Sequence, residues 1–250
     1  SLGDADGACS VAFNLRALES ASQSLRDRLS SEQWGLMRGL EEGFLSVLDA
    51  AAGRVPPTHR AIAALDQLAL QLAAATGTQT DRMTRDHGWR LLTVGRLLER
   101  LIGLTQRLQA FADTGAIASP PGVELLLDLF DSAITFRSRY QRHDDLLALI
   151  ELLVVDNANP RALAGALRRL RTELRKLPGD ATLSDAWLAR LPAEGAGLQL
   201  QHLAGLDDAG LVQRLHALCD GLQSVALDLA EDIGHQYFTL PGGADEAHRV

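Results

Sequence analysis

The sequence has few aromatic residues and only two cysteines among its 250 residues. Phe, Trp and Tyr together make up 4% of the chain, whereas Leu and Ala dominate. Because strands draw on β-branched and aromatic side chains, this composition favours helices over sheets. Cys9 and Cys219 lie far apart and lack the spacing of a metal site. We therefore expect reduced thiols, as in a cytoplasmic protein.

The chain also lacks a long apolar run and a positive net charge. No stretch approaches the roughly 18 apolar residues of a membrane span, and no secretion signal opens the sequence. A net charge of −8 argues against general nucleic-acid binding. We predict a cytoplasmic protein without membrane or nucleic-acid partners. Lys176 is the lone lysine, which reflects either a GC-rich genome or selection of arginine for bidentate anion recognition.

Turn residues divide the chain into segments of helical periodicity. No segment alternates polar and apolar residues between turns, so the sequence predicts an all-α fold, an antiparallel bundle of about eight helices without a sheet. Asn159 is the expected N-cap of the 160–177 helix, with Pro160 as its first residue. We expect one domain over residues 1–240 and a flexible tail at 241–250. The expected helices are 9–29, 30–52, 58–76, 80–112, 122–142, 143–155, 160–177 and 207–238, with a short one near Trp187.

A charged stripe is expected on the 80–112 helix, opposite a broad arc of Leu, Ile and Val. Four arginines against one glutamate make it positive, and its Trp could stack on a guanidinium. Three interpretations are open: a solvated helix face, an Arg–Glu network that joins helices, or a site for a carboxylate, a phosphate or a partner's acidic surface. The stripe consists of Arg85, Trp89, Arg96, Glu99, Arg100, Gly103 and Arg107.

A second charged segment lies at residues 128–142. Arg139 shares one side of this expected helix with Asp128 and Asp131. Arg137 instead falls with Phe130 on an apolar side, where an arginine more often extends its charge towards water than binds a ligand. If Arg137 is buried, it needs an acid or several carbonyls as partners.

The motifs of familiar enzymes are absent from the sequence. There is no Walker loop, dinucleotide-binding fingerprint or nucleophile elbow. Glu231 and His235 are four residues apart, but a di-iron bundle needs two Glu-x-x-His motifs. We therefore expect neither a metal nor a cofactor in this chain, and a self-contained enzyme is not indicated.

Residues 85–100 have the pattern R-D-x-G-W-R-x-x-x-x-G-R-x-x-E-R. This segment resembles the Alpha-E family, an α-helical domain with a Glu-Arg motif, and LSSEQW at 29–34, LLVVDNANPRAL at 152–163 and IGHQYF at 233–238 agree. The resemblance puts the motif at Glu99 and Arg100. Family members open with a further helix that carries its own Glu-Arg motif. No counterpart precedes Ala8, so we expect the N-terminal part of the family domain to be missing.

The resemblance also implies binding residues and partners. Besides Glu99, the best catalytic candidate, the expected binding residues are Arg85, Asp86, Trp89, Arg96, Arg100 and, from the FRSRY segment, Arg137, Arg139 and Tyr140. Proteins of this family occur fused to or beside circularly permuted ATP-grasp ligases, often with transglutaminase-like proteins. The implied role is in ATP-dependent amide or peptide bond formation, with ATP and Mg bound by the partner ligase.

Three functions are therefore open. The chain could be an accessory domain that binds the ligase, or a carboxylate or peptide substrate, through the Arg/Glu stripe. It could instead be a catalytic acyl-transfer or hydrolase domain that acts on the ligase product, with Glu99 as acid/base. The third interpretation is a helical scaffold in which the stripe only joins helices.

Overall fold

The computed structural model describes residues 2–4, 6, 10–49, 58–140, 145–179, 181–192, 203 and 205–238. All regular structure in these ranges is helical and the helices pack in bundles, so the all-α prediction is confirmed. The chain forms two compact units, Ser1–Thr84 and Arg85–Val250, each with its own hydrophobic core. The single domain over 1–240 stays a prediction, and the expected tail at 241–250 lies outside the described residues.

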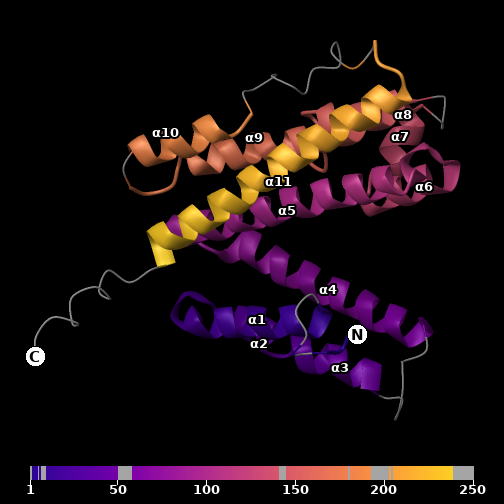
Figure 1. The fold of residues 1–250 in the computed structure, drawn as a ribbon. Coiled ribbons are helices and arrows are strands. Elements are labelled where there is room, and N and C mark those ends of the chain that lie inside the picture. Colours follow the sequence, from indigo (N-terminus) through magenta and orange to yellow (C-terminus); the bar gives the residue numbers. More distant parts are fainter. Residues whose placement is uncertain are drawn as a thin grey trace, which may run out of the picture. The chain divides into compact units, whose positions relative to one another are not determined.

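The first unit consists of short helices packed on one long helix. Its elements are α1 (Val11–Ser24), the 3₁₀ turn η1 (Arg26–Arg28), α2 (Ser31–Arg38), α3 (Leu40–Asp49) and α4 (Thr58–Arg82), drawn from indigo to purple in Figure 1. α3 packs on α1 and α4, and α2 also contacts α4. Ser30 and Gln33 form a reciprocal capping box at the start of α2. Gly39 separates α2 from α3, so the expected 30–52 helix is in fact two helices.

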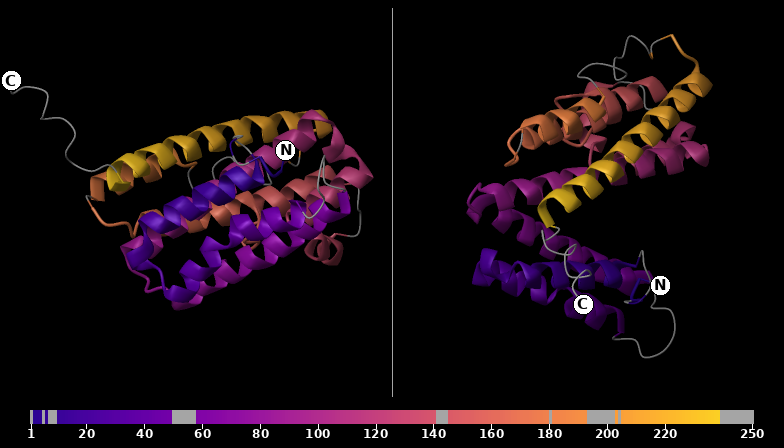
Figure 2. Two further views of the ribbon diagram at one scale, coloured as in Figure 1. Left: turned by 90° about the horizontal axis from the view of Figure 1, so that it is seen from below. Right: turned by 60° about the vertical axis from the view of Figure 1, so that its left-hand side comes forward.

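The second unit is built around α5 (His87–Asp113), which packs against α9 (Leu163–Leu174) and α11 (Asp208–Phe238). Both neighbours run antiparallel to α5. On α11, Asp220 pairs with Gln109 and His216 with Asp113, in reverse order along the two helices. α11 is the long yellow helix of Figures 1 and 2. The remaining elements are η2 (Ala116–Ala118), α6 (Pro120–Leu129), α7 (Ala133–Arg139), α8 (Leu146–Ile150), the π-helical turn η3 (Glu151–Val155) and α10 (Ala181–Arg190).

The expected 80–112 helix is wrong at its N-terminal end. α4 continues past Gly77 to Arg82, and residues 83–86 are not helical. α5 begins only at His87, where the Asp86 carboxylate accepts the backbone N–H of Trp89 at 3.0 Å. An aspartate stabilises a helix most as its N-cap, where it satisfies an otherwise unpaired N–H group. Gly77 has open space around it, and α4 continues through it despite the low helix propensity of glycine.

The expected 122–142 helix is likewise two helices, because the chain turns between Leu129 and Ala133. Asp131 adopts a left-handed backbone conformation with φ of 46°. The backbone N–H of Ser132 donates to the carbonyl of Leu127 at 2.8 Å, which closes the end of α6. Because of this break, the helical positions of α7 do not continue those of α6, and the face on which each residue of α7 lies differs from that of one continuous helix. Arg137 is exposed on α7, which agrees with an arginine that extends its charge towards water, so it needs no buried partner.

Asn159 is not the N-cap of α9. Its side chain is buried, and its Nδ2 donates to the carbonyl of Leu152 at 3.1 Å. Its Oδ1 accepts the backbone N–H of Arg161, two residues on, at 3.0 Å. This is a local Asx-type turn that competes with capping. α9 consequently begins at Leu163, preceded by Ala162, which has no side-chain cap.

Candidate functional site

The N-terminal end of α5 holds three of the predicted site residues together. Arg85 precedes the helix, and its guanidinium carbon lies 5.5 Å from the centre of the Trp89 ring. This confirms the expected stacking of a guanidinium on Trp89. Asp86 caps the helix through the N–H of the same Trp89. The Asp86 carboxylate thus has a structural role in starting α5.

One ion pair joins α5 to α9. Arg90 Nη1 lies 3.3 Å from Glu173 Oε2, and only 25% and 14% of the two side chains are exposed. Lys176 Nζ binds the other oxygen of Glu173 at 2.9 Å. One interpretation of the stripe was an Arg–Glu contact that joins two helices. Such a contact is present, but its arginine is Arg90, which does not belong to the predicted stripe.

Further along α5, the positive charges of neighbouring arginines lower the pKa of two arginine side chains. Partial burial lowers the pKa of Arg96, and the charge of Arg169 on α9 lowers it further. Burial also lowers the pKa of Arg100, followed by the charges of Arg169, Arg96 and Arg161. All four side chains remain accessible to solvent. We call Arg96, Arg100, Arg161 and Arg169 the arginine cluster.

Glu99 is not the acid that balances this cluster. It is exposed, and it makes no ion pair within the part of the chain that the structure describes. Its charge is not among the causes that shift the pKa of Arg96 or Arg100. Asp131 does reach the cluster and forms an ion pair with Arg161.

The FRSRY segment lies beside two acids. Arg139 forms an ion pair with Asp156. Burial raises the pKa of Tyr140 to about 12, with a further contribution from the negative charge of the nearby Glu151. Burial also acts to raise the pKa of Asp156, but the Arg139 guanidinium and the N–H of Ala158 outweigh it and lower the pKa. The charge of Arg139 is thus compensated locally.

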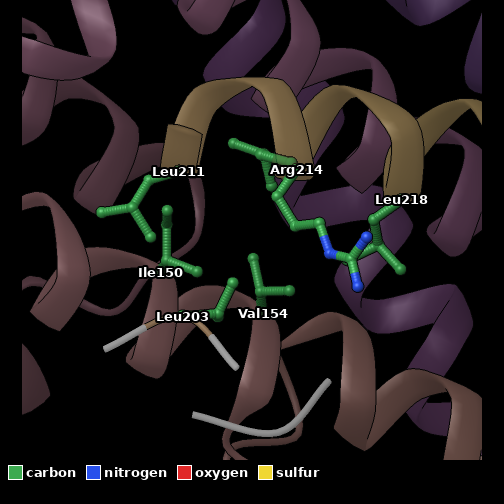
Figure 3. A pocket seen from close by; sticks show the side chains of 7 residues that line it. Ile150, Val154, Leu203, Leu211, Arg214 and Leu218 are labelled. Carbon is green, nitrogen blue, oxygen red and sulfur yellow. The ribbon is translucent and has the colours of Figure 1, made fainter. Parts of the chain in front are cut away.

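A small apolar hollow lies apart from the predicted site residues. It occupies about 250 Å³, including space open to solvent, between the end of α8, η3 and α11. Figure 3 shows Ile150, Val154, Leu203 and Leu211 around it, with the guanidinium of Arg214 extended beside Leu218. Its apolar lining does not suit an anion.

The described ranges contain neither a metal-ligand cluster nor a membrane-spanning helix. No group of three or more His, Cys, Asp or Glu side chains in them is placed to hold a metal ion. None of the helices in these ranges is long and apolar enough to cross a membrane.

The sequence reasoning missed Arg90, Arg161, Arg169 and Glu173. Arg161, Arg169 and Glu173 are separated by multiples of four, which places them near one side of a helix that continues from 160 to 177. That spacing was an available signal. What the spacing could not provide is the register of α9 against α5, which brings Arg169 to Arg96 and Arg100.

Comparison with known proteins identifies the family. The family model of Alpha-E, described as a predicted alpha-helical domain with a conserved ER motif, matches residues 1–238. The chain belongs to the Alpha-E family. Glu99-Arg100 is the single Glu-Arg dipeptide of its sequence, which agrees with the position predicted for the motif.

The relatives that this chain resembles are longer proteins. The uncharacterized protein Rv2567 of Mycobacterium tuberculosis is 27% identical over 246 residues, which cover 96% of this chain. The uncharacterized protein Mb2597 of Mycobacterium bovis has the same identity and coverage. This chain spans 28% of the length of these relatives. No solved structure matches it.

Proposed function

We propose that this Alpha-E chain is an accessory helical domain that works with a circularly permuted ATP-grasp ligase, fused or separate, in ATP-dependent amide or peptide bond formation. Its arginines hold a carboxylate of the substrate or an acidic surface of the ligase. The ligase binds ATP and Mg, and a transglutaminase-like protein is a further candidate partner.

The observation that supports this proposal is the arginine cluster. Arg96 and Arg100 of α5 stand near Arg169 of α9, and these charges disfavour one another. An anion bound among them relieves this repulsion and accepts charge-assisted, bidentate hydrogen bonds. In a chain of net charge −8, a local excess of guanidinium groups is an unusual feature that an anionic partner explains.

A scaffold role is the second candidate, and the Arg90–Glu173 pair favours it. This half-buried pair ties α5 to α9 without needing a ligand. It accounts for Arg90, but it offers no reason for gathering Arg100 and Arg169, which repel each other. The accessory function is therefore preferred.

The test is ATP-dependent product formation by the neighbouring ligase over a panel of amino acids and polyamines. We expect product only with this chain present, and a loss of about tenfold or more when Arg96 and Arg100 are both changed to Gln, since hydrogen bonds to charged groups contribute about 1.5–3 kcal/mol each. Arg107→Gln is the control, because Arg107 lies on the same helix but outside the arginine cluster. Full turnover by the ligase alone would contradict the proposal. An activity of this chain alone that depends on Glu99 would favour catalysis instead.

A further inference from the structure

We infer that α5 and α9 together form one binding site for a multiply charged oxyanion, with Arg169 of α9 as its central residue beside Arg96 and Arg100. This inference rests on the proposed anion-binding role of α5 and names the class of anion. It adds to the site a helix that lies outside the family's Glu-Arg motif.

The register of the two helices brings these arginines to one place. Arg90, near the start of α5, pairs with Glu173, near the end of α9. Arg100, further along α5, is instead influenced by the charge of Arg161, which precedes α9. The two helices are therefore antiparallel. Distances along the shared axis can be counted from the Arg90–Glu173 pair with a helical rise of about 1.5 Å per residue. Arg169 lies about 6 Å from the pair on α9, and Arg96 and Arg100 lie about 9 and 15 Å from it on α5, in the same direction. Arg169 is thus within reach of both.

The charges that remain uncompensated determine the class of anion. Arg161 is paired with Asp131. Arg100 and Arg169 make no ion pair with any residue in the described ranges, so at least two positive charges lack an acid there. A monoanion would leave one of them unbalanced, whereas a dianion balances both. Phosphate groups and closely spaced pairs of carboxylates both have this charge, and both match the planar fork of arginine.

The surroundings of the cluster also suit a ligand. The Arg96 and Arg100 side chains are accessible to solvent, so an anion can reach them. They are nevertheless partly desolvated, which strengthens their interaction with a bound charge relative to that in water.

Calorimetric titration of the full chain with inorganic phosphate, malonate and acetate at constant ionic strength tests this inference. We expect saturable binding of phosphate or malonate and much weaker binding of acetate. Tighter binding of phosphate would identify a phosphate group as the ligand, and tighter binding of malonate would identify a pair of carboxylates. Acetate bound as tightly as the dianions, or no saturable binding of either dianion, would overturn the inference.

Arg168 and Arg169 provide a matched pair of variants. Both are exposed arginines of α9 and adjacent in sequence, but only Arg169 influences Arg96 and Arg100. We expect Arg169→Gln to weaken dianion binding about tenfold or more and Arg168→Gln to change it less than about twofold. Equal losses would indicate general electrostatic attraction and overturn the site. If Arg169→Gln does not fold, Arg169→Lys serves, with partial retention of binding expected because the charge stays while the fork is lost.

These titrations contain no ligase. A failure of ligase coupling therefore leaves their outcome unchanged, and a chain that binds no dianion could still support the ligase through protein contacts. The inference and the proposed function can thus fail separately.

Discussion

At the scale of single residues, arginine has two physical roles where α5 meets α9, and neighbouring acids decide between them. Arg90 is held by Glu173 and joins the helices. Arg100 instead stands among arginines, and it forms no ion pair in the described part of the chain, whereas its neighbour Arg161 is paired with Asp131. A paired arginine stabilises the bundle, whereas an excess of arginine is available to a ligand.

Cys219 is expected to be unreactive in the folded chain. It is fully buried, and burial raises the pKa of its thiol from 9.0 to about 12. Because the thiolate is the reactive form, iodoacetamide at pH 8 should label Cys219 at least about a hundredfold more slowly than in denaturant. The Cys9→Ser variant leaves Cys219 as the sole thiol for this measurement. Equal rates in the folded and denatured chain would contradict the burial.

The same thiol affects stability at high pH. The folded state keeps the thiol proton longer than the unfolded state, so its contribution is complete below about pH 9. The contribution declines as the pH rises towards 12.

Gly165 is expected to tolerate no side chain. A Cβ there would lie 2.2 Å from the backbone oxygen of Asn159, and neither backbone can easily move away. Gly165→Ala should lower the free energy of unfolding by about 1–3 kcal/mol, as measured in urea. Gly95→Ala on α5 is the control, because its Cβ meets nothing within 4 Å, and it should stabilise by up to about 1 kcal/mol. The same sign for both variants would contradict this account.

Only part of the arginine cluster could be predicted from the sequence. Arg96 and Arg100 are four residues apart on one helix, so local spacing is enough to bring them together. Arg161 and Arg169 join them only because α9 packs antiparallel on α5 in one register. That register depends on side chains across the whole interface, which no local pattern contains.

At the scale of elements, caps and turns decide where helices end. The periodicity of residues 80–112 continues across the start of α5, so it could not reveal the break at residues 83–86. The start of α5 after this break is marked by a hydrogen bond from the Trp89 N–H to the Asp86 carboxylate. Similarly, the turn at Asp131 gave no sequence signal, because aspartate adopts a positive φ less readily than glycine.

Asp86→Ala should therefore destabilise the second unit by about 1 kcal/mol, because an N–H group of α5 loses its partner and the helix dipole loses a favourable charge. Thermal unfolding followed by circular dichroism measures this change. Asp86→Ser should retain most of the stability, since serine also caps well. If both variants lose the same amount, the carboxylate acts in some way other than capping.

At the scale of the whole molecule, the chain contains two separate hydrophobic cores. Leu15, Phe44 and Leu68 belong to the first unit, and Leu101, Phe136 and Leu170 are among the residues of the second. The described residues of each core come from one unit alone, so each unit has a hydrophobic core of its own. We therefore expect the loss of a core side chain in one unit to destabilise that unit and to leave the other unit unchanged.

Phe44→Ala should loosen the first unit selectively. Phe44 is 2% exposed, and its truncation leaves a cavity that costs about 3–5 kcal/mol. Hydrogen exchange followed by mass spectrometry should show faster exchange in α1–α4 and unchanged protection in α5–α11. Phe136→Ala, at an equally buried site of the second unit, should give the reverse pattern. Uniform loss of protection in either variant would mean that the two cores unfold as one.

The most direct test of the arginine site follows the side-chain Nε–Hε resonances by NMR while inorganic phosphate is added. The resonances of Arg96, Arg100 and Arg169 should shift together and saturate at one phosphate per chain, while those of Arg107 and Arg168 stay in place. Small shifts that spread over all exposed arginines without saturation would contradict a single anion site between α5 and α9.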